Sequence, residues 1–388
     1  MAKIGMKARN EVIGKQKKRY RKSAKKAKGE ILDGVCQATG LSRDRAARLL
    51  SECGAGNQGC KGPPKKRGRK TVYGPDVDAP LRMVWACMDF ACGKRLAAGM
   101  GDMLDALIAH GEIECTADVE AQLRSMSAST MDRRLAPDRA KTVLRGISAT
   151  KPGTLLKRDI PLRHGTEWGD AIPGYVEIDL VAHCGTSTAG EYINTLNITD
   201  ICTGWTEPVA VINKAQKHVF EGLVDAEARQ PFPYLGIDSD NGSEFINHEL
   251  YRYCRDSHIC FTRGRPNKKN DGCHVEQKNW SLVRRHIGYA RYEGKAALKL
   301  LNEYYGLLRL LVNFFLPSTK LTGKERDGAR VTKKYDTPTT PYRRALASEY
   351  IPEGEKRRLA ETFSRLNPAE LQREMKRVYN ELYKLGTS

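Results

Sequence analysis

The order of short apolar segments from residue 174 onwards constrains the fold of this chain more than any other feature. Three segments with the length and composition of strands follow one another, separated by short polar turns, which is the pattern of successive hairpins. Beyond them, helical and extended patterns alternate. The predicted strands are 174–183, 191–200, 203–211, 234–240 and 259–263, and the predicted helices are 214–227, 247–257 and one that begins near His274.

This order of elements is typical of an α/β fold of the ribonuclease-H kind. At 388 residues the chain is too long for a single core, so we expect two to four folded units. The predicted segments are a basic helix-turn-helix domain at 1–58, a basic flexible linker at 59–76, a helical region at 77–150, a connector at 151–173, the α/β core at 174–316 and a basic region, extended and then helical, at 317–388.

The positive charge lies at the two ends of the chain. Of the formal net charge of +20, residues 1–70 carry +16 and residues 317–388 carry +6, so the middle is close to neutral. Basic ends around a neutral core suggest arms that hold a polyanion, most simply the phosphates of DNA. The alternative for a basic run is a solvated tail.

Residues 30–50 have the pattern of a helix-turn-helix. An apolar stripe at helical spacing ends at Thr39-Gly40, and Ser42 is a good N-cap for a second helix. The second helix of such a pair is the natural reader of the major groove, although an ordinary helical hairpin gives the same pattern. The residues of this helix expected to contact DNA are Arg43, Arg45 and Arg48.

Two further segments carry cations that suit DNA. The linker lacks periodicity, and its Lys/Arg run is suited to a minor groove. Within 77–150, Ser127 caps the second helix of another candidate helix-turn-helix, for which a purely structural helical bundle is an equal alternative. The candidate contacts are Lys65, Lys66, Arg67, Arg69 and Lys70 in the linker, and Arg133 and Arg134 in the helical region.

Three acidic residues come from different elements of the predicted core. Asp179 lies in the middle of an apolar strand, Asp240 ends the fourth strand before Asn-Gly, and Glu276 lies in the first turn of the helix after a polar loop. An acid within an apolar strand is costly unless it is paired or binds a metal. Phosphodiester transfer uses two hard cations held by about three converging carboxylates.

With 35 residues between Asp240 and Glu276, this arrangement resembles the integrase-like DDE recombinases, which include retroviral integrases and bacterial insertion-sequence transposases. The resemblance covers about residues 171–316, in the segments GYVEIDLVAH, GIDSDNGSEF and NDGCHVEQKN, and Phe245 falls at the family's position for a packing aromatic. It implies that Asp179, Asp240 and Glu276 are the catalytic residues and hold two Mg²⁺ ions, with Mn²⁺ as a substitute.

Two neighbouring acids compete with this assignment. Asp238 shares a strand face with Asp240 but leaves 37 residues to Glu276 and lacks the following Asn-Gly. Glu177 shares a face with Asp179, but the family's first carboxylate ends the apolar triplet. We therefore prefer Asp179 and Asp240, with Asp238 as a candidate to tune the site without holding a metal.

The resemblance implies further roles near the triad. Asn279 matches an asparagine often seen in DDE cores, and we assign it to DNA binding together with the loop residues Arg265, Lys268 and Lys269. His183 is a candidate to touch a phosphate or a second-shell carboxylate, or it is structural.

On the helix that follows Glu276, this chain departs from the retroviral pattern. It has Trp280 and Val283 where retroviral integrases place lysines that grip DNA. The cations available to substitute for those lysines are Lys278, Arg284 and Arg285.

The C-terminal region divides into two parts. Residues 318–344 are rich in Lys, Arg, Thr and Pro, which predicts an extended segment along DNA. A helix then begins at Asn367-Pro368. Its apolar stripe is either a docking face for another subunit or packs on its own domain; the stripe comprises Leu371, Met375, Val378 and Leu382.

The expected architecture is thus an α/β ribonuclease-H-like catalytic core with an N-terminal all-α helix-turn-helix DNA-binding region and a basic C-terminal extension. The resemblance implies a DNA transposase that binds terminal inverted repeats, cleaves 3′ ends by metal-dependent hydrolysis and joins them to target DNA by transesterification. Its partners would be double-stranded DNA, as transposon ends and target, and further copies of itself, at least a dimer on DNA.

Other features bear on location and on competing functions. No apolar run long enough to span a membrane occurs, and the eleven cysteines lack metal or disulfide spacing, so we expect a cytoplasmic, nucleoid-associated bacterial protein. The competing functions are a DNA-binding protein without chemistry and a nuclease without joining activity. A phage transposase differs only in its genetic setting.

Overall fold

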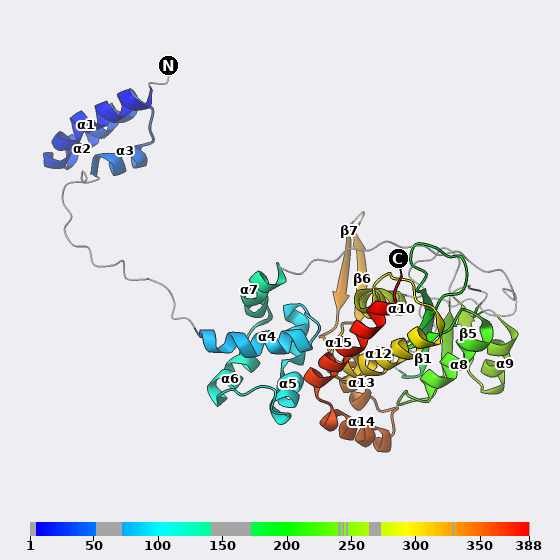
Figure 1. The fold of residues 1–388 in the computed structure, drawn as a ribbon. Helices are drawn as coiled ribbons and strands as arrows, with labels where there is room; N and C mark the ends of the chain where they lie inside the picture. The colour runs from blue at the N-terminus through cyan, green and yellow to red at the C-terminus, as the bar shows by residue number, and fades with distance from the viewer. Residues whose placement is uncertain are drawn as a thin grey trace. The chain divides into compact units, whose positions relative to one another are not determined.

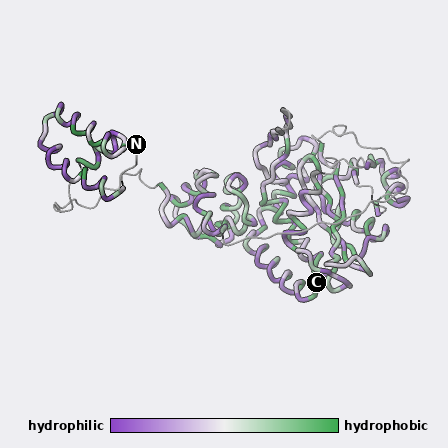
Figure 2. The backbone as a smooth tube through the Cα atoms, turned by 90° about the horizontal axis from the view of Figure 1, so that it is seen from above, coloured by the Kyte–Doolittle hydropathy of each residue, from purple (hydrophilic) through white to green (hydrophobic). Residues whose placement is uncertain are grey.

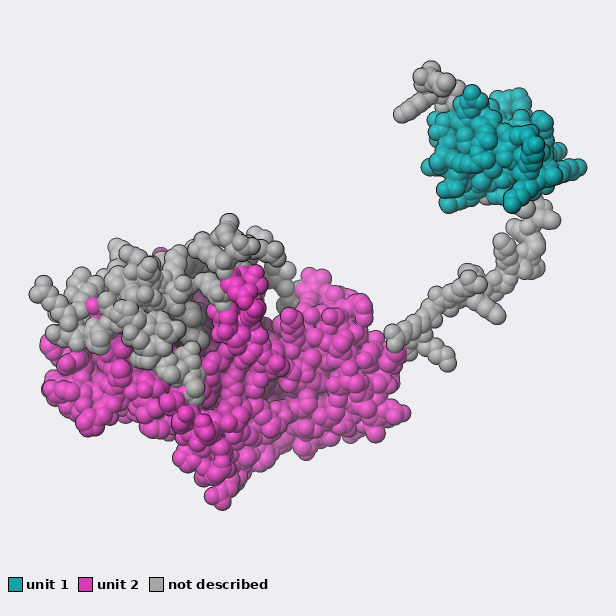
Figure 3. Space-filling model, turned by 180° about the vertical axis from the view of Figure 1, so that it is seen from behind, with its two compact units in different colours: residues 1–71 teal, residues 72–388 magenta. Residues whose placement is uncertain are grey.

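The computed structural model describes residues 5–51, 72–140, 172–239, 242, 244–245, 247–263, 273–327 and 330–387. The chain divides into two compact units, residues 1–71 and 72–388 (Figure 3). The helical region at 72–140 and the α/β core therefore belong to the same compact unit. None of the described helices is long and apolar enough to cross a membrane.

The first unit contains three helices, α1 (Met6–Lys22), α2 (Lys25–Thr39) and α3 (Arg43–Ser51). Gly40 ends α2 in the left-handed conformation, with φ of +66°, which a glycine adopts without strain. Hydrophilic residues predominate along these helices (Figure 2). The small core consists of Ile13, Leu32, Val35, Ala46 and Leu50.

The second unit opens with a helical block. It contains the 3₁₀ turn η1 (Pro75–Val77) and the helices α4 (Asp78–Cys87), α5 (Gly93–Ala109), α6 (Ala117–Ser125) and α7 (Ala128–Arg139). The predicted cap of α7 is confirmed, because Ser127 Oγ accepts a hydrogen bond from the Thr130 amide at 3.3 Å. The apolar side of this block merges into one hydrophobic cluster with helices from the far end of the chain.

The core is a five-stranded mixed sheet with the order β3-β2-β1-β4-β5 (Figure 1). The strands β1, β2 and β3 form an antiparallel meander, and β4 and β5 join β1 in parallel. All five predicted strands are present. They are β1 (Tyr175–Ala182), β2 (Asn194–Asp200), β3 (Thr206–Val211), β4 (Gly236–Ser239) and β5 (Cys260–Arg263).

Helices cover both faces of this sheet. The face formed by Val176, Ile178 and their neighbours packs against α8 (Gln216–Glu227) and α9 (His248–Asp256). The buried Phe245 belongs to this cluster, which fits its expected role as a packing aromatic. The opposite face, on the side of Glu177 and Asp179, is covered by α10 (Cys273–Lys278) and α12 (Gly294–Phe315).

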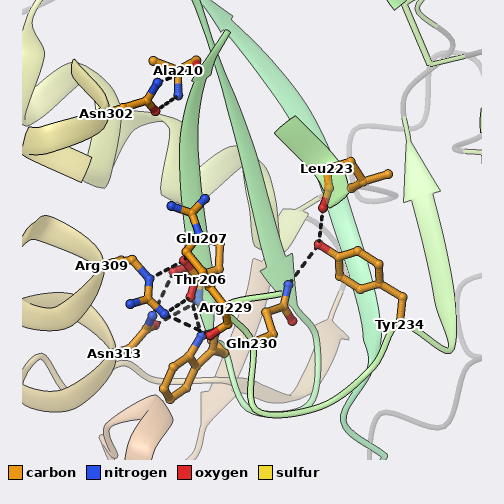
Figure 4. A network of polar contacts seen from close by, with 11 residues as sticks. Thr206, Glu207, Ala210, Leu223, Arg229, Gln230, Tyr234, Asn302, Arg309 and Asn313 are labelled. Atoms are coloured by element: carbon orange, nitrogen blue, oxygen red, sulfur yellow. Dashed lines mark hydrogen bonds and ion pairs between the residues drawn. The ribbon is translucent and has the colours of Figure 1, made fainter. Parts of the chain in front are cut away.

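Helix α12 also seals the edge strand β3 with amide side chains (Figure 4). Asn313 accepts from the Thr206 amide and donates to the Thr206 carbonyl, both at 2.9 Å. Asn302, three helical turns earlier, does the same at Ala210, at 2.9 and 3.0 Å. These contacts fix α12 to the sheet through polar groups as well as through apolar packing.

A buried charge cluster reinforces the same junction. Glu207 of β3 has no exposed surface and accepts hydrogen bonds from Arg309 of α12 at 2.7 Å and from the Trp205 indole at 2.8 Å (Figure 4). A buried carboxylate persists only when it is paired and hydrogen-bonded in this way.

The C-terminal region contains the two-stranded ribbon β6 (Leu321–Asp327) and β7 (Arg330–Tyr335), followed by α13 (Pro341–Ala347), α14 (Glu353–Arg365) and α15 (Pro368–Leu385). The segment predicted as merely extended is thus a hairpin. The apolar stripe of α15 packs on its own domain, against α12, and is not a free docking face. Its residues Leu371, Met375, Val378 and Leu382 are all buried.

Candidate active site

Asp179 lies on β1, half-buried, on the sheet face covered by α10. The side-chain amide of Asn279 donates to Asp179 Oδ2 at 2.6 Å, and the Leu180 amide donates to Oδ1 at 2.8 Å. Asn279 in turn accepts from Asn197 Nδ2 at 3.0 Å, and Asn197 pairs with Asp179 across the β1–β2 ladder. These hydrogen bonds fix the orientation of the Asp179 carboxylate on its strand.

Glu177 and Asp238 occupy the interior of the same sheet and are almost completely buried, at 1% and 2% exposed. They are direct neighbours in the parallel β1–β4 register. Glu177 Oε2 accepts from the Val275 amide at 3.1 Å, and Asp238 Oδ1 accepts from Thr262 Oγ1 at 2.6 Å. Each therefore holds the fold together, and Glu177 ties the start of α10 to β1.

For the other two acids of the predicted triad, the structure describes only the backbone of Glu276. Asp240 follows Ser239, the last residue of β4, and lies outside the described residues. Glu276 belongs to α10, one residue after the Val275 amide that Glu177 holds, but its side chain is not described. Arg265, Lys268 and Lys269 also lie outside the described residues, as do Lys65, Lys66, Arg67, Arg69 and Lys70.

The prediction that Asn279 contacts DNA needs correction. Its side chain is engaged by Asp179 and Asn197, so it positions a carboxylate and is not presented to a phosphate. The sequence did not reveal Asn197 as its partner. Only the register of the β1–β2 hairpin, which sets Asn197 opposite Asp179, gives a signal for it.

The helix that carries Glu276 changes to π geometry at η2 (Asn279–Arg284), a distortion frequent at functional sites. At the two positions where retroviral integrases carry lysines, Trp280 is 55% exposed and Val283 is buried. Val283 is therefore part of the core, while Trp280 faces solvent one turn beyond Glu276.

The cations proposed to replace those lysines are mostly occupied by other groups. Arg284 donates to the Ala182 carbonyl at 2.9 Å and stacks on Tyr289, and Arg285 pairs with Asp89 at 3.2 Å. Burial, together with the nearby cations Arg95 and Arg344, lowers the pKa of Lys278 to about 7. Substitution by Arg284 and Arg285 is thus not supported by their contacts.

His183 has the structural role, the second of the two alternatives that its sequence position left open. It is completely buried and its Nε2 bonds Thr195 Oγ1 at 2.7 Å, which in turn bonds the Tyr305 hydroxyl at 2.7 Å. Burial, reinforced by the charge of Arg284, lowers the pKa of His183 to about 3. A neutral, enclosed imidazole links β1, β2 and α12 and cannot touch a phosphate.

The candidate DNA contacts on helices differ in their surroundings. On α3, Arg45 and Arg48 are exposed, and Arg43 is exposed but pairs with Asp33. On α7, Arg133 is exposed. Arg134 instead bonds Asp78 and the Gly74 carbonyl, both at 2.7 Å, so its assignment to DNA is corrected to a structural role.

Comparison with known proteins identifies the domain that contains Asp179. Residues 170–269 match the integrase core domain model, so the second unit contains an integrase core domain. That stretch includes Asp179 and Asp240.

The chain belongs to the same family as the uncharacterized protein y4rM of Sinorhizobium fredii. The two are 39% identical over 344 residues, which cover 88% of this chain and 96% of that protein. The similarity to this relative therefore extends over nearly the whole chain. The predicted resemblance to integrase-like proteins is confirmed by the match of residues 170–269 to the integrase core domain.

Two solved retroviral structures are also similar to this chain. The HTLV-2 integrase catalytic core in complex with magnesium is 15% identical, covers 39% of this chain and 93% of its own, and has a TM-score of 0.30. The BIV integrase catalytic core is 18% identical, covers 46% and 96%, and has the same TM-score of 0.30.

Proposed function

We propose that this chain is a DDE-type DNA transposase, which cleaves the 3′ ends of a mobile element and joins them to target DNA. The observation that carries the proposal is the construction around Asp179. This half-buried carboxylate is held by Asn279 at 2.6 Å, on a helix whose start is tied by Glu177 to the same strand. One strand thus organises both Asp179 and the helix that bears Glu276.

The donor chemistry fits divalent metal ions. Carboxylate oxygens are the donors that Mg²⁺ prefers, and Asp179 is half-buried. Glu177 and Asp238 are almost completely buried and accept hydrogen bonds, Glu177 from the Val275 amide of α10 and Asp238 from Thr262 of β5. Asp179, Asp240 and Glu276 would hold two Mg²⁺ ions, or Mn²⁺ in their place. When bound, such ions activate an attacking oxygen and stabilise the leaving oxygen of a phosphodiester.

The protein's own residues would position this chemistry. Asn279 orients one carboxylate of the site, and the buried Glu177 keeps α10 in place while DNA binds. Arg45 and Arg48 of α3 would read the terminal inverted repeats. Because two ends must be joined together, at least a dimer on DNA would be required.

The test is cleavage and strand transfer on labelled duplexes that tile the DNA flanking the coding sequence, with Mg²⁺ or Mn²⁺. We expect joined products from the wild type and at least a 100-fold loss in Glu276→Gln and Asp240→Asn, as for removal of a group on which the whole reaction depends. The matched variant Asp238→Asn keeps an acceptor for Thr262 and should retain most activity.

Each other outcome identifies a different function. Cleavage without joining would indicate a nuclease, and specific binding without chemistry in any variant would indicate a DNA-binding protein. Loss in Asp238→Asn together with full activity in Asp240→Asn would move the second carboxylate to Asp238.

A further inference from the structure

The β6–β7 ribbon lies outside the five-stranded sheet that forms the core of the second unit. It forms a two-stranded sheet separate from the five-stranded one and stands out from the surrounding helices (Figure 1). A two-stranded hairpin by itself is only marginally stable in water. Contacts with the rest of the domain must therefore hold it in place.

The base of the ribbon is firmly fixed. Ser318 and Thr339 exchange backbone hydrogen bonds at 3.0 and 3.1 Å just outside the two strands. Asp336 accepts from the Lys320 amide at 2.6 Å and from Arg344 at 3.0 Å, and Lys320 Nζ donates to the Cys202 carbonyl at 2.9 Å. The direction in which the ribbon leaves the domain is thus set by the domain itself.

The register divides the charges of the ribbon between its two faces. Lys324 lies opposite Lys333 and Arg326 opposite Val331, and directly opposed residues share a face. By the same alternation, Lys334 and Arg330 lie on the other face with Glu325 and Asp327. One face therefore has three cationic positions and no acid, and the other is balanced, with an ion pair between Lys334 and Glu325.

Two lysines directly opposite each other destabilise a ribbon that is already marginal. A polyanion removes that repulsion, and the DNA major groove admits a two-stranded ribbon. Most protein–DNA hydrogen bonds go to phosphate and sugar oxygens, and lysines bind phosphates as point charges, so we assign the contacts of this face to phosphates. The occupant that fits these features is duplex DNA of any sequence.

We propose that the Lys324–Arg326–Lys333 face of the β6–β7 ribbon docks on duplex DNA through its phosphates, irrespective of sequence. This inference rests on the proposed function only in that DNA is the substrate. It adds to the full chain a DNA contact separate from α3 and from the catalytic carboxylates.

The test compares two double variants with the same change of charge in the same ribbon. Lys324→Ser/Lys333→Ser alters the cationic face, and Arg330→Ser/Lys334→Ser alters the balanced face. Binding of a labelled duplex of arbitrary sequence is measured by fluorescence anisotropy over a series of salt concentrations, without divalent metal. Thermal unfolding of both variants checks that the domain remains folded.

The cationic-face variant should lose about tenfold in affinity near 0.1 M salt, and its log–log salt slope should fall by about 2, since each phosphate contact contributes roughly 0.9. The balanced-face variant should keep a slope close to that of the wild type. Equal losses in both variants, or no loss in either, would overturn the proposal.

The assay separates this inference from the proposed function. Because it needs no catalysis, it can be repeated in the Glu276→Gln background, where the same difference between faces is expected. Strand transfer by a protein whose two ribbon variants bind alike would keep the transposase and reject the ribbon contact. A change of oligomeric state in the cationic-face variant, with an unchanged salt slope, would instead assign the ribbon to contacts between copies.

Discussion

The three-helix unit and the helical block α4–α7 both have the sequence pattern of a helix-turn-helix, yet the structure uses their arginines differently. On α3, Arg45 and Arg48 are exposed. In the block, arginines pair with acids of the same block. These pairs are Arg82–Asp138, Arg124–Asp105, Arg134–Asp78 and Arg139–Asp132.

The two regions also differ in how they are supported. The three-helix unit has its own core of five buried residues, whereas the block shares one apolar cluster with α12 and α15. A basic segment with a small independent core suits a DNA reader, and a charge-balanced segment fused to the catalytic domain suits a structural role. The local net charge distinguishes them better than the helical pattern does.

The largest effect should come from α3. Arg45→Ala/Arg48→Ala should weaken binding to element-end DNA by about 100-fold, because a base-reading arginine contributes roughly 1–3 kcal/mol. Competition between end DNA and random duplex in gel-shift assays measures this. Lys17→Ala/Lys25→Ala, with the same charge change in the same unit, should weaken both duplexes equally. An unchanged preference for end DNA in the arginine variant would remove α3 as the reader.

An intermediate effect is expected for Arg134→Ala. This substitution should lower the stability of the fold and leave DNA affinity unchanged. It removes the bonds to Asp78 and the Gly74 carbonyl and should cost about 2 kcal/mol, since hydrogen bonds to charged groups contribute roughly 1.5–3 kcal/mol. Urea unfolding of the full chain gives the free energy, and gel shifts give the affinity. A stable variant with weakened DNA binding would restore α7 as a DNA reader.

The smallest effect should be that of Arg133→Ala. Arg133 is exposed on α7, and within the described part of the chain its side chain donates to Thr130 of the same helix, at 3.3 Å. Its loss should change stability by less than about 0.5 kcal/mol, as for most surface substitutions. If α7 is structural, the DNA affinity of Arg133→Ala is also unchanged within about twofold. A tenfold loss of DNA affinity would mean that α7, like α3, contacts DNA.

Local sequence signals predicted much of this fold. Alternating apolar residues located all five strands of the sheet, and Gly40, Ser127 and Asn367 marked helix ends that the structure confirms. These features depend on neighbours a few residues away, so a single sequence reveals them.

The features that escaped prediction depend on distant partners. Arg134 meets groups 56 to 61 residues earlier in the chain, and Asn279 meets Asp179 across 100 residues. The buried His183 bonds Thr195, which in turn bonds Tyr305, far along the chain in α12. The 35-residue spacing selected the candidate acids from the sequence, but the groups that orient Asp179 become visible only when the sheet register is known.

The amide seal on β3 has a consequence for assembly. An edge strand ordinarily exposes backbone groups that can pair with another chain. Here Asn313 and Asn302 occupy the outward backbone groups of Thr206 and Ala210, and Pro208 between them has no N–H to offer. The sheet therefore cannot be extended at this edge by a strand from a second copy, and pairing of strands between copies would have to use the opposite edge, β5.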